Sequence, residues 1–309
     1  MSAPASDIVS VICANCGKAE EDGSIQLKSC VACKIVKYCN VECQRSHRPQ
    51  HKRECKKAAM LLHETALFQM PPKTECPICF ITMTGSPLEM KYQNCCGKVI
   101  CIGCIHAAYK LKGTDVCPFC RTVGHSHDDH EEMIKRIKKR VEAGDDFAMS
   151  QFACYYAYGK HGIQQDWAKA LKLWNRAGQL GNAAAYHNLG NLYCKGIGVK
   201  RDFNKAKHYW ELAAIRGDVE ARFNLGVMEG KNFNIPRSLE HYMIAASFGH
   251  DESLKNIRDY YSEGYATKVQ YETALRAHQK YADEVKNDQR DEAAVFRNEC
   301  LGQSSLEEM

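Results

Sequence analysis

The sequence predicts a multi-domain protein in which two small zinc-folded modules are followed by an all-α helical-repeat solenoid. Two observations carry this prediction. Fifteen of the 18 cysteines lie before residue 121, most of them in close pairs, and the second half of the chain repeats a glycine-containing pattern. Metal would fold the front half, where large apolar residues are scarce, and an apolar core would fold the back half.

The first module is indicated by eight ligand-type side chains between residues 13 and 55, spaced as C-x₂-C, C-x₂-C, C-x₃-C and H-x₃-C. The four pairs are Cys13 with Cys16, Cys30 with Cys33, Cys39 with Cys43, and His51 with Cys55. Zn²⁺ binds four thiolate or imidazole ligands in a tetrahedron, so eight ligands predict two zinc sites. Disulfides are the alternative, which the lack of a secretory signal in "MSAPASDIVS" disfavours.

The order and spacing of these ligands resemble the MYND zinc finger, with "KYCNVEC" and "HRPQHKREC" as its closing half. The resemblance implies that the first and third pairs share one zinc and that the second and fourth pairs share the other. It also implies binding of short partner peptides, commonly proline-rich ones. Arg48 stands where the family often has an aromatic residue, and His47 is expected to lie beside the second site rather than in it.

A linker and a second cysteine-rich module follow. Residues 56–75 are expected to form a short helix stopped by Pro71-Pro72, which then acts as a semi-rigid spacer. Four further cysteine pairs lie within residues 76–121: Cys76 and Cys79, Cys95 and Cys96, Cys101 and Cys104, Cys117 and Cys120. Three of these pairs have the C-x₂-C spacing, which predicts additional metal sites.

Residues 76–121 resemble a RING finger. The resemblance implies a complete first site made by Cys76, Cys79, Cys101 and Cys104. The second site would use Cys96, Cys117 and Cys120, but Lys98 stands where a histidine is expected, and its ammonium offers no lone pair. Cys95 is the favoured replacement, His106 or Asp115 are alternatives, and an empty site is the remaining outcome. The chain is thus expected to hold three to four zinc ions.

In the RING family the finger holds a ubiquitin-conjugating enzyme, and its contribution to the rate is positional. The contact positions implied by the resemblance are Ile78, Pro118 and Arg121. Local packing of the first two and a solvated Arg121 are the alternative interpretation. The predicted function is a RING-type ubiquitin ligase whose MYND finger and repeats recruit partners, with no catalytic side chain assigned. The alternative is a non-catalytic scaffold or adaptor, including a nuclear co-regulator.

Residues 122–143 are expected to be a linker and a basic capping helix. The run "HSHDDHEE" at 125–132 is expected to be a solvated segment that opens this helix rather than a metal site. Apolar residues then recur at helical spacing at Met133, Ile134, Ile137 and Val141. The run "KRIKKR" at 135–140 is a candidate nuclear import signal, or a solvated helix face.

The back half contains an internal repeat. Similar segments place glycines at 144, 181, 217 and 249, at intervals of 37, 36 and 32 residues. Periods of this length predict stacked helix pairs. The pattern resembles the Sel-one-like repeat, a relative of the tetratricopeptide repeat, over residues 144–285. The last copy is expected to be a terminal cap, and residues 286–309 a flexible tail.

The charge and the apolar runs of the sequence indicate which kinds of partner the chain is expected to bind. A net charge of +5 is mild, and no basic stripe with stacking aromatic residues favours nucleic acid. No apolar run reaches the length of a transmembrane helix. The expected partners are proteins, among them a ubiquitin-conjugating enzyme and proline-rich peptides, and the expected location is the cytoplasm or the nucleus.

Overall fold

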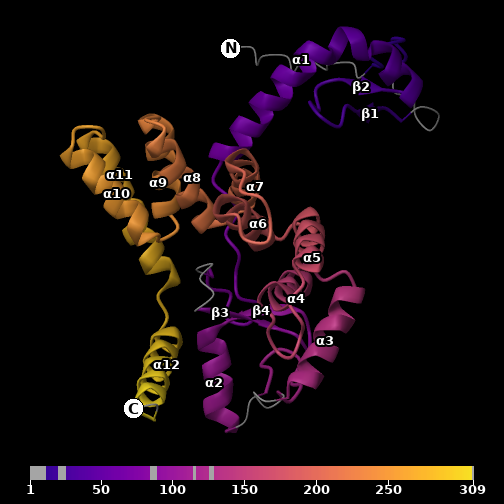
Figure 1. The fold of residues 1–309 in the computed structure, drawn as a ribbon. Helices are drawn as coiled ribbons and strands as arrows, with labels where there is room; N and C mark the ends of the chain where they lie inside the picture. Colours follow the sequence, from indigo (N-terminus) through magenta and orange to yellow (C-terminus); the bar gives the residue numbers. More distant parts are fainter. Residues whose placement is uncertain (1–11, 20–25, 84–88, 114–115, 125–128, 308–309) are drawn as a thin grey trace, which may run out of the picture. The chain divides into compact units, whose positions relative to one another are not determined.

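The computed structural model describes residues 12–19, 26–83, 89–113, 116–124 and 129–307, and the side chains among them as far as residue 298 (Figure 1). The chain forms two compact units, Met1–Gln69 and Met70–Met309. None of the helices that the structure describes combines the length and the apolar character that a membrane span requires.

The first unit consists of a short ribbon and one long helix. Its elements are β1 (Lys28–Ser29), β2 (Lys37–Tyr38) and α1 (Val41–Phe68), and the two strands pair antiparallel. Asn40 begins α1 by accepting a hydrogen bond from the Cys43 N–H at 2.8 Å. The short helix expected at the start of residues 56–75 is therefore the second half of a longer helix, whose first half carries Cys43, His51 and Cys55, three of the predicted ligands.

The second unit opens with a hairpin and a helix. These elements are β3 (Met90–Gln93), β4 (Lys98–Cys101) and α2 (Ile102–Lys112), with Met90 opposite Cys101 in the antiparallel register. Gly113 ends α2 in the left-handed conformation, with φ of 63°.

The rest of the second unit is helical. The helices are α3 (His130–Glu142), α4 (Asp146–Tyr158), α5 (Trp167–Leu180), α6 (Ala183–Lys195), α7 (Phe203–Ile215), α8 (Val219–Lys231), α9 (Ile235–Ala246), α10 (Asp251–Ser262), α11 (Lys268–Val285) and α12 (Asp288–Glu307). Helices α3 to α11 pack on one another in chain order, as a helical-repeat solenoid does (Figure 1). Helix α3, for which a capping role is expected, packs on α4: its Ile137 is fully buried against Phe152 and Tyr155.

Glycine allows the repeat helices to approach closely. A Cβ added at Gly190 of α6 would lie 2.4 Å from the Trp210 ring of α7, and one added at Gly226 of α8 would lie 2.5 Å from the Tyr242 ring of α9. Each glycine thus provides the space for an aromatic ring of the next helix. The glycines that start the sequence repeats have another role: Gly181 and its equivalents adopt positive φ between helices.

Gly190→Ala is therefore expected to destabilise the solenoid. The added methyl group must displace the rigid, buried Trp210 ring, and such overpacking costs about 1–3 kcal/mol. Alanine's higher helix propensity offsets at most about 1 kcal/mol of this. Urea unfolding followed by tryptophan fluorescence measures the effect, since all three tryptophans lie in the repeats. In a Trp210→Leu background the same substitution should cost less, and an equal cost in both backgrounds would contradict the steric explanation.

The prediction of a flexible tail at residues 286–309 is wrong, because residues 288–307 form helix α12. This helix packs on α2, where Phe296 lies 5.0 Å from His106 between ring centres. Arg290, only 7% exposed, donates hydrogen bonds to the carbonyls of Thr82 at 2.8 Å and Ile81 at 3.2 Å. The polar composition suggested solvation, whereas the two terminal nitrogens of the buried Arg290 guanidinium donate to backbone carbonyls, two of which lie far away in the sequence.

Candidate metal centres

Four groups of metal-ligand side chains converge, and within each group the ligand atoms all lie within 4.8 Å of one another. The groups are Cys13, Cys16, Cys39 and Cys43; Cys30, Cys33, His51 and Cys55; Cys76, Cys79, Cys101 and Cys104; and Cys95, Cys96, Cys117 and Cys120. The first two groups form the first finger (residues 13–55), and the last two form the second finger (residues 76–121). All sixteen residues that the sequence singled out as ligands are thus brought together.

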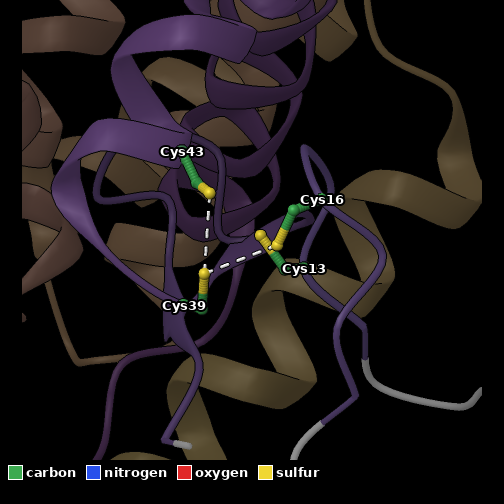
Figure 2. A group of neighbouring side chains, drawn as sticks. All are labelled: Cys13, Cys16, Cys39 and Cys43. Carbon is green, nitrogen blue, oxygen red and sulfur yellow. Dashed lines mark hydrogen bonds between the residues drawn. The ribbon is translucent and has the colours of Figure 1, made fainter.

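The first group joins the loop at residues 13–16 to the start of α1. Figure 2 shows the sulfurs of Cys13, Cys16, Cys39 and Cys43 pointing toward one another. The Sγ atoms of Cys39 and Cys43 are 3.5 Å apart, and those of Cys16 and Cys39 are 3.6 Å apart. A tetrahedral zinc with Zn–S bonds of about 2.3 Å places its sulfurs about 3.8 Å from one another, so the spacing fits the ion.

The second group joins the turn between β1 and β2 to α1. The Sγ of Cys33 lies 3.2 Å from the Nε2 of His51, and the sulfurs of Cys30 and Cys55 are 3.7 Å apart. His47 lies outside the group. It stacks on His51 with 5.6 Å between ring centres, and its Nδ1 is 3.0 Å from the Tyr38 hydroxyl. His47 therefore supports the position of the His51 ring from one helical turn away.

Of the five C-x₂-C pairs, the one at 101–104 lies at the start of α2, whereas the four at 13–16, 30–33, 76–79 and 117–120 share one backbone geometry. The residue after each second cysteine has positive φ, and its N–H donates to the carbonyl of the first cysteine at 2.9 to 3.0 Å. These residues are Gly17, Lys34, Phe80 and Arg121. A left-handed conformation at three non-glycine residues costs free energy, so the turn is held by the surrounding ligands. Sequence reasoning missed this feature, for which the only signal is the C-x₂-C spacing itself.

The first site of the second finger is buried. Cys76, Cys101 and Cys104 are almost inaccessible and pack with Ile100 in a small core. The sulfurs of Cys76 and Cys104 lie 3.9 Å apart. Arg290 of α12 reaches this site, with its guanidinium 4.0 Å from the Cys79 sulfur. The finger therefore surrounds this site with its own core and with α12.

The second site of the second finger contains the doubled cysteine. The sulfur of Cys95 is 3.4 Å from that of Cys120, and the sulfur of Cys96 is 3.8 Å from that of Cys117. The two neighbouring cysteines converge because they lie in the turn between β3 and β4, where side chains do not alternate as they do along a strand. Gly97, with φ of 75°, completes this turn.

Lys98, at the position expected for histidine, and His106, another candidate for the fourth ligand of this site, make other contacts. Lys98 directs its Nζ over the Phe119 ring, 5.5 Å from the ring centre. His106 packs against Phe296 of α12. Asp115 lies outside the described residues. The site also contacts the solenoid, because Arg140 of α3 donates a hydrogen bond to the Cys95 carbonyl at 2.9 Å.

In each of the four groups, the pKa of at least one thiol is lowered. Burial raises the pKa of Cys13, but hydrogen bonds from neighbouring backbone N–H groups lower it to about 6. The backbone N–H of Cys33 lowers the pKa of Cys30 to about 6 against the effect of burial. In the second finger, burial is likewise outweighed by hydrogen bonds, and the pKa is about 7 for Cys76 and about 6 for Cys120. Other thiols of the same groups are held protonated, and burial together with hydrogen bonding to Cys30 raises the pKa of Cys55 to about 11. The thiolate is the form that binds zinc, so each group offers one thiol that ionises readily and can bind the ion first.

The remaining sequence predictions concern residues outside these groups. Ile78 and Pro118 are half-buried, and Arg121 is exposed on the second finger. Of the histidine-rich run at 125–132, residues 125–128 lie outside the described residues. His130 begins α3, and its Nδ1 lies 3.2 Å from the Nδ1 of His161. Of the basic run at 135–140, Arg136 pairs with Glu132 at 2.9 Å.

An apolar groove lies on the first finger beside its second ligand group. It has a volume of about 680 Å³ and runs between the β1–β2 turn and α1. Val31 and Met60 line it and are 79% and 63% exposed. Arg48, Lys52 and Lys56 follow one edge at four-residue spacing, which places three cations on one face of α1. The groove can therefore hold an apolar segment flanked by negative charge.

Comparison with known proteins identifies two kinds of module. The MYND finger family matches residues 13–55, and the Sel1 repeat family matches residues 147–182 and 183–218. No curated protein gave a significant match. The predicted fold class is confirmed, as are the resemblances to the MYND finger and to the Sel1 repeat.

Solved structures with similar folds were also found. A Sel1 repeat protein from Oxalobacter formigenes is 28% identical, with a TM-score of 0.44, over 53% of this chain and 66% of its own. A protective antigen of uropathogenic Escherichia coli strains with an SLR fold is 27% identical, with a TM-score of 0.43, over 50% of this chain and 33% of its own. The chain therefore spans about two thirds of the first structure's length and about one third of the second's.

The two matched modules share a type of activity. Both the MYND finger and the Sel1 repeat act in protein–protein interaction, and the four ligand groups fit zinc. The chain thus combines a MYND finger at residues 13–55 with Sel1 repeats that include residues 147–218.

Proposed function

We propose that this zinc-dependent interaction protein is a ubiquitin ligase of the RING type that works in the cytoplasm or nucleus. The observation that carries the proposal is the fourth group, in which the sulfur of Cys95 joins those of Cys96, Cys117 and Cys120 and so offers a ligand in place of Lys98. A complete second site would keep the surface between the two metal centres of the second finger ordered. An ordered surface of this kind is what a conjugating enzyme needs for docking.

The proposed contact residues are accessible. Ile78 and Pro118 lie in the first and last knuckles, and both keep part of their surface open to solvent. Helix α12 contacts α2 at Gly103 and His106, and its Arg290 reaches the end of the first knuckle at Cys79. Ile78 and Pro118 nevertheless keep exposed surface with α12 in place. This arrangement supports a docking surface that remains open while α12 is in place.

The chemistry assigned to the finger is positional. A ubiquitin thioester on the conjugating enzyme is attacked by an amine, and the finger restrains the thioester in a reactive orientation. Arg121 is exposed, and its backbone is fixed by the knuckle hydrogen bond to the Cys117 carbonyl at 2.9 Å. Its planar guanidinium can donate to two partners at once, which a lysine cannot do with the same geometry.

Arg121→Ala is expected to slow ubiquitin discharge from a loaded conjugating enzyme at least about tenfold, the scale of one lost charge-assisted hydrogen bond. Zinc content and the folded state should not change, because Arg121 contributes no ligand. Lys91→Ala is the matched control, since it removes an exposed cation from the same finger. Equal discharge by the wild type and Arg121→Ala would contradict the role of Arg121.

A non-catalytic adaptor is the second candidate, and the groove on the first finger favours it. We propose that this groove binds proline-containing peptides with acidic flanks, because its floor is apolar and its edge carries Arg48, Lys52 and Lys56. An adaptor would bind such peptides without accelerating discharge. A full-length protein that captures the peptide but leaves the thioester intact with a panel of conjugating enzymes would support the adaptor and exclude the ligase.

A further inference from the structure

A short segment that follows the first unit, Met70–Lys73, lies against the repeats of its own unit. Pro71 is buried and lies beside Gly217, where an added Cβ would stand 3.4 Å from the Pro71 Cβ. The hydroxyl of Ser247, at the end of α9, lies 3.8 Å from the Met70 sulfur. Connecting segments are usually solvated, so a buried proline indicates that the repeats hold this one.

Lys73, at the basic end of the segment, contacts two side chains of α11. Lys73 forms an ion pair with Glu284 of α11. The Lys73 ammonium also lies 5.5 Å from the centre of the Tyr281 ring, close enough for a cation–π interaction. Tyr281 is in turn fixed by a hydrogen bond that its hydroxyl donates to the Met83 carbonyl at 3.3 Å. Helix α11 thus offers an acidic and an aromatic side chain to one lysine.

The space beside the segment continues along the repeats. It has a volume of about 610 Å³ and is lined by Thr74, by α11, and by the turns that precede α6, α8 and α10. Val219 and Phe248 supply apolar surface there, and Arg216 and Asp218 supply charge. Met70–Lys73 lie at the end of this groove, because Pro71 contacts Gly217 and Lys73 contacts Tyr281, and both of these residues line it. Successive repeats present equivalent turns to the groove, which therefore extends beyond these four residues.

We propose that this groove is a receptor for extended partner peptides that carry an apolar residue, two prolines and a basic residue in that order, and that Met70–Lys73 occupies it in cis. Proline fixes its own φ and restricts the preceding residue to extended conformations, so such a peptide loses little entropy on binding. A cis occupant reduces the apparent affinity for a partner by the fraction of molecules in which the groove is open.

A charge exchange in the full-length protein tests this proposal. The probe is a fluorescent peptide with the sequence of residues 67–75, LFQMPPKTE, and binding is followed by polarisation. Lys73→Glu places two negative charges together and should open the groove, so the peptide should bind about tenfold more tightly than to the wild type. Glu284→Lys removes the receptor for the peptide's lysine and should weaken binding below the wild-type level. Lys200→Glu changes an exposed charge elsewhere in the unit and should have no effect.

The double variant Lys73→Glu/Glu284→Lys shows whether Lys73→Glu acts by releasing residues 70–73 from the groove or by disturbing the fold. It restores an ion pair of opposite polarity, so the groove should close again and the affinity gained by Lys73→Glu should be lost. Unchanged zinc content and circular dichroism show that each variant is folded. Equal peptide affinity in the wild type, Lys73→Glu and Glu284→Lys would place the peptide elsewhere, for example in the first-finger groove, and would overturn the proposal.

Discussion

Replacing Cys33 by alanine is expected to release both zinc ions of the first finger and to unfold it. Cys33 is fully buried, and its sulfur lies 3.2 Å from the His51 Nε2. A structural zinc contributes about 10–16 kcal/mol in zinc-finger peptides, which equals or exceeds the total stability of a typical domain. Native mass spectrometry should therefore count two zinc ions in the variant and four in the wild type, and hydrogen exchange should show protection lost over residues 26–55.

The loss of two ions rather than one follows from the order of the ligands. Along the chain the pairs alternate between the two groups, so the Cys30–Cys33 turn lies between the two halves of the first group. The core of this finger consists mainly of its own cysteines, with Leu27 and Tyr38 as the large buried apolar side chains. Little apolar burial therefore remains to hold one group when the other is lost.

Cys194→Ala is the control for this experiment. Cys194 lies on α6, outside the four ligand groups, and is half-buried. Its replacement should leave four zinc ions and the protection of residues 26–55 unchanged. Four zinc ions in the Cys33→Ala protein would contradict the assignment of Cys33 as a ligand.

The ligand groups could be predicted from the sequence because metal chemistry acts through local spacing. A pair such as Cys76 and Cys79 fixes two corners of a tetrahedron within four residues, so the pairs are visible without knowledge of the fold. The repeats were visible for a related reason, since the turn glycines at 144, 181, 217 and 249 recur along the sequence. The helix glycines that admit an aromatic ring from the next helix recur with the same period. Gly190 and Gly226, for example, are 36 residues apart.

The features that the sequence did not predict depend on distant contacts. Residues 286–309 were expected to be a flexible tail because their sequence is polar. Helix α12 packs on α2 and is joined to the finger by Arg290, whose partners, the carbonyls of Ile81 and Thr82, are about two hundred residues away in the chain. The packing of Pro71 beside Gly217 is another such contact. Local propensity contains no information on either pairing.

Cys95→Ser is expected to remove one zinc ion and leave the other three. A serine hydroxyl stays protonated near neutral pH and is a poor zinc ligand. The loss should remain local, in contrast to that in the first finger, because the buried site of the second finger has additional support. Its cysteines pack around Ile100, and Arg290 joins the neighbouring backbone to α12. Native mass spectrometry should count three zinc ions, and hydrogen exchange should increase in the turn at residues 94–97 while α2 stays protected.

Three further variants separate Cys95 from the other groups that were candidates for the fourth ligand. Lys98→Ala, His106→Ala and Asp115→Ala should each keep four zinc ions, because Cys95 completes the group without them. A loss of zinc in one of these variants, with four ions retained in Cys95→Ser, would transfer the ligand role to that residue. If the second finger is a ligase, Cys95→Ser should also abolish ubiquitin discharge, since Pro118 and Arg121 are positioned by the turn that this site holds. Zinc loss with unchanged discharge would separate the metal site from the activity and would support the adaptor.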